Sequence, residues 1–306
     1  MSASDPAAAS THWRHHRERG SQLLLRFMTH ASLRLGRPCT RVILYLTVIY
    51  FFLFAPGTRR QSRAYLRRVL GRLPTAGERF RHILSFATVI HDRIFLMHGR
   101  SELFQITLQG QEFLGELLQQ GNGAFLFGAH LGNFEIVSAV GQRHPGLKLA
   151  MAMYETMARK VNRVFAAVRP ASAPEIIGIG QLEAMLRIRA CLDEGTFVGI
   201  LADRTLGNEP VLQVPLLGSP APLPTGPMRA AALMRRPVVF MAGLYRGGNR
   251  YHVVFEPVAD FRHIEPRGRD AAITAAIERY AALLEQYCRS DPYNWFNFYD
   301  FWHLHG

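Results

Sequence analysis

The chain has 306 residues, 48% of them hydrophobic, so it can bury a sizeable core and is not a disordered chain. Its 26 Gly and 17 Pro exclude the collagen-like and low-complexity classes, and its length fits one large domain or two modest ones. The formal net charge of +13 lies entirely in residues 1–100, which hold 17 Arg and four acids. Genomic base composition is the plain explanation for the preference for Arg over Lys, so the position of the charge is more informative than its size.

Three cysteines, Cys39, Cys191 and Cys288, are widely spaced. They form neither a disulfide framework nor a C-x-x-C metal pair, and we expect reduced thiols. The histidines likewise show no metal-ligand spacing. The sequence therefore predicts no metal site and no organic cofactor.

The N-terminal part of the chain has the character of a membrane anchor. Residues 1–20 are small, polar and basic, which predicts a mobile tail. We expect anchoring helices over residues 21–75. Ser21–Gly36 repeats apolar residues at helical spacing between arginines, as in a helix that lies in a lipid interface. Val42–Pro56 is uncharged but shorter than the roughly 20 residues that cross a bilayer.

Arginines flank this apolar run on both sides, so a single crossing would carry one basic cluster over the membrane, against the positive-inside tendency. We therefore expect a monotopic or hairpin anchor on the cytoplasmic leaflet, attracted to anionic headgroups. The alternative is a buried helix of a soluble protein. The five aromatic residues of the run, ringed by Arg, argue against that alternative.

After a last helix of the anchoring region, over 61–71, the domain of residues 76–306 alternates helical and strand patterns. Helices are predicted over 78–98, 112–120, from 133, 156–168, 180–193, 227–235 and 269–289, and strands over 104–108, 124–130, 148–154, 176–178, 197–202, 211–217, 238–244 and 251–255. This alternation predicts an α/β fold, with a mixed, largely buried sheet flanked by helices.

The stretch GAHLGNFE, residues 128–135, is the strongest chemical signal. His130 ends an apolar strand, Gly132 turns the chain, and Glu135 follows inside the next helix. An imidazole can take a proton from an alcohol near neutral pH, and a nearby carboxylate can orient it. The turn also offers backbone N–H groups suited to an oxyanion. A histidine at a strand end is commonly structural, but the carboxyl end of a strand is where open α/β sheets bind ligands.

This stretch resembles the H-x4-D/E motif of the bacterial lipid A biosynthesis acyltransferases, part of the wider lysophospholipid acyltransferase-like group. The likeness extends over about residues 13–305. GTFVGILADR (195–204) is similar to the family's strand that ends in an aspartate, and PLLG with PTG (215–226) to the segment that follows it. RPVVF (236–240) is similar to a later strand.

The resemblance implies a membrane-associated enzyme that moves a fatty acyl group from acyl carrier protein or coenzyme A to a hydroxyl of a lipid or glycolipid. It implies His130 as the general base and Glu135 as its orienting carboxylate. Asp203 and Arg204 match the motif near the acceptor, where Arg204 is suited to hold an anionic headgroup; a surface salt bridge is the alternative.

Arg169 matches a family arginine, and Asn133 lies within the motif, so both are candidate substrate contacts. The resemblance further implies the cytoplasmic face of a bacterial inner membrane as the location. The implied partners are the membrane lipid acceptor, an anionic membrane surface and an acidic acyl carrier protein, with no nucleic acid.

The chain departs from the family pattern near its end, where the family has a basic Trp-x-His-Arg-Arg-like segment and this sequence reads NWFNFYDFW (294–302). The change favours a less phosphorylated acceptor than lipid A, as in the branch that accompanies pigment or polyene lipids. The aromatic residues either line an acyl chain or pack in the core.

Two other functions remain open at this point. An acyl-thioester hydrolase would replace the acceptor alcohol by water, although no Gly-x-Ser-x-Gly elbow is present. A non-enzymatic binder of anionic membranes or nucleic acid would explain the charge. The arginines, however, surround an apolar run rather than a polar groove.

Overall fold

The computed structural model describes residues 22–143, 146–154, 174–205 and 209–302. A seven-stranded sheet in the order β1-β9-β8-β2-β5-β3-β4 forms its centre. Its strands are β1 (Gln105–Gln109), β2 (Phe125–Gly128), β3 (Leu149–Tyr154), β4 (Glu175–Ile179), β5 (Phe197–Leu201), β8 (Pro237–Tyr245) and β9 (Arg250–Asp260). Neighbours are parallel except β8 and β9, which form an antiparallel hairpin. The predicted mixed, largely buried sheet is confirmed.

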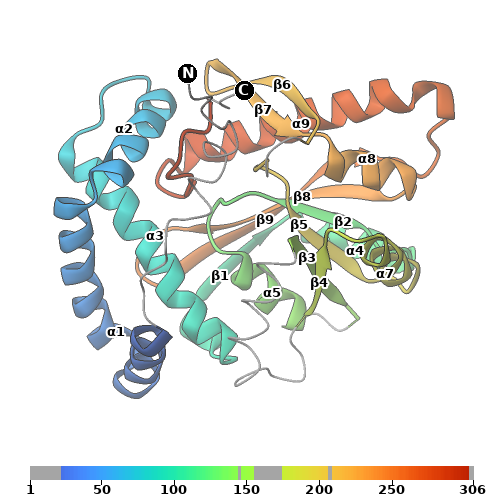
Figure 1. The fold of residues 1–306 in the computed structure, drawn as a ribbon. Coiled ribbons are helices and arrows are strands. Elements are labelled where there is room, and N and C mark those ends of the chain that lie inside the picture. The colour runs from blue at the N-terminus through green and yellow to red at the C-terminus, as the bar shows by residue number, and fades with distance from the viewer. Residues whose placement is uncertain (1–21, 144–145, 155–173, 206–208, 303–306) are drawn as a thin grey trace, which may run out of the picture.

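Helices cover both faces of the sheet, as Figure 1 shows. They are α1 (Gln22–Phe54), α2 (Pro56–Leu70), α3 (Ala76–Met97), α4 (Gln111–Gln119), α5 (Phe134–Arg143), α7 (Leu182–Asp193), α8 (Gly226–Leu233) and α9 (Arg269–Ser290). Short 3-10 turns lie at Ser101–Leu103 and Pro266–Gly268. A separate hairpin of β6 (Val211–Leu216) and β7 (Ser219–Pro224) lies beside α9.

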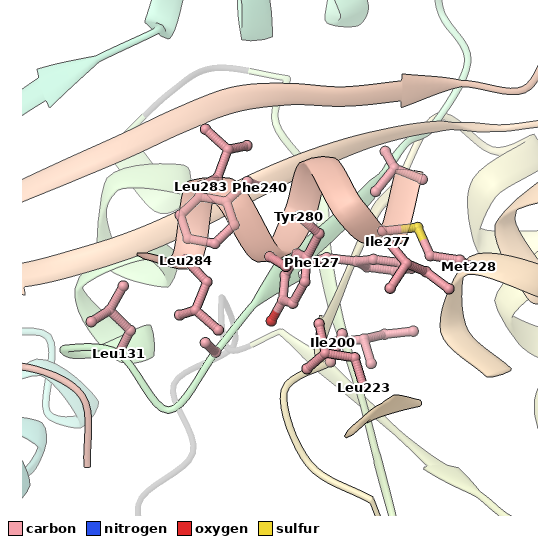
Figure 2. Close-up of a cluster of buried hydrophobic side chains, with 14 of the residues drawn as sticks. Phe127, Leu131, Ile200, Leu223, Met228, Phe240, Ile277, Tyr280, Leu283 and Leu284 are labelled. Atoms are coloured by element: carbon pink, nitrogen blue, oxygen red, sulfur yellow. The ribbon is translucent and has the colours of Figure 1, made fainter. Parts of the chain in front are cut away.

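The alternation of side chains along β2 divides the core into two layers. Phe125 and Phe127 pack in the layer that contains α8, α9 and the β6–β7 hairpin, whereas Leu126 packs in the layer of α3, α4 and α5. Figure 2 shows the first layer, where Phe127 lies near Tyr280 and Phe240. All four residues of β2 are buried, as expected for an apolar strand covered on both faces. Its neighbours β5 and β8 hold it in place on either side.

The predicted elements of the domain are largely confirmed, and one difference has a physical cause. Ser219–Pro224 was not predicted as a strand, because its prolines cannot donate to a ladder; the two-stranded hairpin tolerates them at its edges. Helix α1 consists of two helical pieces that meet at Gly36, where φ is 77° and the backbone is not helical, so the expected separation of the two N-terminal segments is confirmed; the second piece begins before residue 42 and ends at Phe54. The predicted helix over 156–168 and the tail over 1–20 lie outside the described residues.

Helix α1 is attached to α3 by a buried polar network. Arg37 makes two bonds to the carboxylate of Asp92, of 2.7 and 2.9 Å, and Tyr251 donates a third at 2.7 Å. The Asp92 side chain is completely buried. Beside this pair, Thr40 Oγ1 lies 2.9 Å from His91 Nε2. The network fixes the kinked half of α1 against the body of the protein.

The opposite face of α1 is apolar and exposed. Val42, Leu46, Ile49 and Leu53 lie on one side of the helix after Gly36, each between 45% and 65% exposed. The segment Thr29–Phe54 is long and apolar enough to cross a membrane by length and composition. Helix α1 packs against α3 and α2.

The Arg37–Asp92 pair generates a stability prediction. Arg37→Leu leaves the buried carboxylate with the Tyr251 hydroxyl, and breaking a buried ion pair costs about 3–5 kcal/mol. Urea denaturation of the full chain measures the change in the free energy of unfolding. Arg72→Leu is the control, because Arg72 is paired with Glu78 at the surface and its side chain is 57% exposed. An equally small effect of both changes would contradict the structural role of the buried pair.

Candidate active site

The candidate site lies where two adjacent parallel strands end. Strands β2 and β5 pair in register, with Gly128 opposite Leu201. His130 and Asp203 each come two residues after these paired positions, so the topology brings them to the same edge of the sheet. This edge is the place expected for a ligand in an α/β fold.

His130 and Asp203 form a hydrogen-bonded pair. His130 Nδ1 lies 2.8 Å from Asp203 Oδ1, and the His130 backbone N–H donates to Oδ2 at 3.0 Å. Trp295 Nε1 also donates to Oδ2 at 3.0 Å, and Asn297 Nδ2 lies 3.4 Å from it. The buried carboxylate is thus surrounded by donors.

These donors keep Asp203 ionised. Burial alone raises the pKa of Asp203, but His130, its hydrogen bonds and Arg204 outweigh that effect and hold the pKa well below its usual range. An ionised carboxylate only accepts hydrogen bonds, so Nδ1 of His130 must carry the proton. The lone pair of the imidazole is therefore on Nε2, for which the described residues provide no hydrogen-bond partner.

The same environment keeps His130 neutral near pH 7. Burial lowers the pKa of His130, and Arg204 and Arg93 act in the same direction, while the Asp203 carboxylate acts against them. The net direction is downward. The side chain remains 30% exposed, so a reactant can approach the ring. A neutral, oriented and accessible imidazole is what a general base requires.

The segment after α9 fixes the loop that carries His130. The Phe296 N–H donates to the His130 carbonyl at 2.8 Å, and the Gly132 N–H donates to the Asn294 carbonyl at 2.8 Å. Leu131 and Trp295 form the bridge between these bonds. The C-terminal segment therefore pairs with the loop through a short antiparallel bridge, and this pairing places the Trp295 indole beside Asp203.

Gly132 is required at the turn for two reasons. Its φ is 72°, which L side chains rarely adopt, and a Cβ there would collide with the Gly243 carbonyl oxygen. The Asn133 N–H donates to that carbonyl at 2.8 Å. The chain can therefore pass close to β8 only at a glycine.

Glu135 does not orient His130, and the expectation that it does is corrected by the geometry. Glu135 lies in the first turn of α5, and its Oε2 is 2.8 Å from Arg93 Nε on α3. The bond to the imidazole comes from Asp203 instead. Glu135 thus faces an arginine whose charge reaches His130, and it acts on the base indirectly.

The structure places the remaining expected site residues as follows. Arg204 donates to Asn297 Oδ1 at 2.9 Å and to the Phe296 carbonyl at 3.1 Å, so its guanidinium holds the C-terminal segment. Asn133 is completely buried and its Oδ1 accepts the Glu135 N–H at 3.1 Å, so in this conformation it has no exposed surface for a substrate. Arg169 lies outside the described residues.

The expected oxyanion donors of the turn are also engaged. The N–H groups of His130, Gly132, Asn133 and Glu135 donate to Asp203, Asn294, Gly243 and the Asn133 side chain, respectively. These four groups are occupied because the loop is pinned on both sides, by β8 and by the C-terminal segment.

Sequence analysis missed Trp295 and Asn297 as contributors to the site. Both belong to the aromatic C-terminal stretch, which was expected to line an acyl chain or to pack in the core. Trp295, Phe296 and Phe301 are buried in the core. The available signal is that an indole N–H and an amide stand next to large apolar side chains in this stretch and need hydrogen-bond partners when buried.

The fold and the site define an α/β enzyme with a His–Asp pair at the carboxyl edge of its sheet. Residues 8–303 match the family described as bacterial lipid A biosynthesis acyltransferase. The match covers nearly the whole chain, and the protein belongs to this family of acyltransferases. A comparison with curated proteins finds no match.

Proposed function

We propose that the protein is a membrane-associated O-acyltransferase in which His130 is the general base. The acyl donor is a thioester on acyl carrier protein or coenzyme A, and the acceptor is a hydroxyl of a lipid or glycolipid. The observation that carries the proposal is the 2.8 Å contact between His130 Nδ1 and an ionised Asp203, which leaves Nε2 free at an accessible ring edge. Together with the family, this favours transfer to an alcohol.

The reaction follows from these positions. Nε2 of His130 takes the proton of the acceptor hydroxyl while the hydroxyl oxygen attacks the carbonyl carbon of the thioester. The imidazolium that forms is stabilised by the Asp203 carboxylate beside Nδ1. When the tetrahedral intermediate collapses, the C–S bond breaks and the thiolate takes the proton back from Nε2. The products are an ester and a free thiol, and His130 is again neutral.

The acceptor is proposed to carry fewer phosphates than lipid A. In the C-terminal segment, NWFNFYDFW contains no basic residue, and Arg204 is engaged in holding that segment. A multiply phosphorylated sugar would need several free guanidinium or ammonium groups there. A pigment or polyene lipid with a hydroxyl fits this segment better.

The membrane contact is proposed to be monotopic, on the cytoplasmic face of a bacterial inner membrane. The exposed apolar face of α1 would enter the lipid, while Arg60, Arg63 and Arg67 form an exposed basic stripe on α2. Arg59 donates to the Phe52 carbonyl at 2.7 Å, which ties the end of α1 to α2. Helix α1 therefore has attachments along its length that favour an in-plane position. An acidic carrier protein would meet the same stripe.

The first prediction concerns the paired side chains. His130→Ala and Asp203→Asn each lower kcat by about 10²–10⁴-fold, because the base or its orienting charge is lost. The measurement is ester formation from acyl carrier protein thioester and extracted membrane lipid. Circular dichroism checks that the variants are folded. Full activity of His130→Ala would overturn the mechanism, and release of free fatty acid regardless of lipid would assign a hydrolase instead.

The second prediction concerns pH. Because the pKa of His130 is lowered, the neutral base persists below pH 6.5, and kcat/KM falls only at more acidic pH. In Asp203→Asn the carboxylate that raises the pKa is gone, so the acid limb moves to still lower pH. Glu135→Gln lowers activity but leaves the limb nearly in place, since Glu135 does not touch the ring. A limb that shifts with Glu135→Gln and not with Asp203→Asn would restore Glu135 as the orienting residue.

The third prediction concerns the membrane. The triple change Leu46→Ser, Ile49→Ser and Leu53→Ser removes the exposed apolar face of α1 and abolishes flotation with vesicles of phosphatidylethanolamine and phosphatidylglycerol.

The matched control replaces Leu186 and Leu233 by Ser, because these are equally exposed leucines on α7 and α8, at 63% and 64%. The control protein floats with the vesicles. Equal flotation of both variants would contradict an α1 anchor.

A further inference from the structure

A cavity of about 530 Å³ lies between α1, α3, the β8–β9 turn and the segment after α9. Its walls include Arg41, Ser85, Thr88, Arg81, Arg246 and Asp291. It is close to the candidate active site, because Asn294 also lines it and the Asn294 carbonyl accepts the Gly132 N–H. It is nevertheless a separate feature, since neither His130 nor Asp203 lines it.

The cavity is positively charged. Three guanidinium groups face one carboxylate, and that carboxylate is already paired, with Asp291 Oδ1 2.8 Å from Arg246 Nε. Arg41 donates to the Gly248 carbonyl and the Tyr245 hydroxyl, so three of its five N–H donors remain. The surplus charge of the walls suits a phosphate.

Arg81 has the fewest contacts of the three arginines. Its guanidinium lies 4.5 Å above the ring of Tyr293, and within the described part of the chain it makes no ion pair or hydrogen bond. The stacking holds the group at the cavity wall while leaving all of its donors available.

The hydroxyl residues of α3 add polar side chains to the same wall. Ser85 and Thr88 lie one turn apart on the helix, and both line the cavity. Thr88 Oγ1 is covered by its neighbours, so the guanidinium groups would make the contacts to a bound oxyanion.

The cavity also borders the apolar face of α1. Tyr45 lines it and is 42% exposed, and Val42, Leu46 and Ile49 are the exposed neighbours of Tyr45 on the helix. A phosphate in the cavity would thus have hydrocarbon-compatible surface directly beside it. Free phosphate shares the polar chemistry but makes no use of this apolar surface.

We propose that this cavity binds the phosphate headgroup of an anionic membrane phospholipid, with its acyl chains along the exposed face of α1. Basic pockets at a membrane-facing helix are suited to such headgroups. A phospholipid bound in this cavity would hold the enzyme at a fixed depth in the membrane. The bound headgroup would lie near the loop that carries His130. The inference rests on the proposed membrane contact but not on acyl transfer.

Native mass spectrometry of the full chain in non-ionic detergent tests this site. With added phosphatidylglycerol, one lipid is retained per chain, and phosphatidylcholine with the same chains is not. The triple variant Arg41→Gln, Arg81→Gln and Arg246→Gln lowers the affinity for phosphatidylglycerol by about 100-fold. Because Arg246 neutralises buried Asp291, the single variant Arg81→Glu is the safer test, and it lowers the affinity by about tenfold or more.

The matched control is Arg189→Gln, Arg229→Gln and Arg267→Gln, which removes the same charge from exposed positions outside α1 and α2 and keeps the bound lipid. Equal retention of phosphatidylcholine, unchanged binding in Arg81→Glu, or an equal loss in this control would each overturn the proposal. Displacement by inorganic phosphate at equal concentration would assign the cavity to free phosphate rather than lipid. A chain that binds the lipid but transfers no acyl group would refute the proposed function alone.

Discussion

The buried carboxylate of Asp203 is the constraint on which the candidate site depends. A charge removed from water is tolerated only where donors replace its hydration, and here they come from two distant parts of the chain. His130 gives its ring and backbone N–H groups, and Trp295 and Asn297 give an indole and an amide. Moving any of these segments away would expose the charge to an apolar core without compensation. The carboxylate therefore enforces the assembly that orients the base.

This arrangement makes the C-terminal segment a support of the candidate site. Asn294 and Phe296 bond the backbone on either side of Leu131, so the loop after β2 has strand-like partners on both sides. A rigid loop costs little to reorganise when an imidazolium forms. The same arrangement occupies four N–H groups of the turn, those of His130, Gly132, Asn133 and Glu135.

The sequence predicts this site only in part, and the missing part is long-range. The apolar runs before His130 and Asp203 predict two buried strands with polar ends, and parallel pairing then brings the ends together. The short spacing between His130 and Glu135 suggests Glu135 as the partner of the imidazole. Glu135, however, lies in the first turn of α5, and the helix determines which way its side chain points. Helix α5 turns it towards Arg93 on α3. Trp295 could not be assigned, because indole contacts across more than ninety residues leave no periodic signal.

Helix α3 connects helix α1 to the candidate site. On one side it holds α1 through the buried Asp92. On the other, His82 Nε2 lies 3.0 Å from the Trp295 carbonyl, and burial lowers the pKa of His82 to about 4. A neutral His82 whose Nε2 faces a carbonyl must donate there, so its Nδ1 accepts from Ser62 of α2 at 3.0 Å. A single helix thus carries one polar contact to α1 and another to the residue that bonds Asp203, so the position of α1 is linked through α3 to the His130–Asp203 pair.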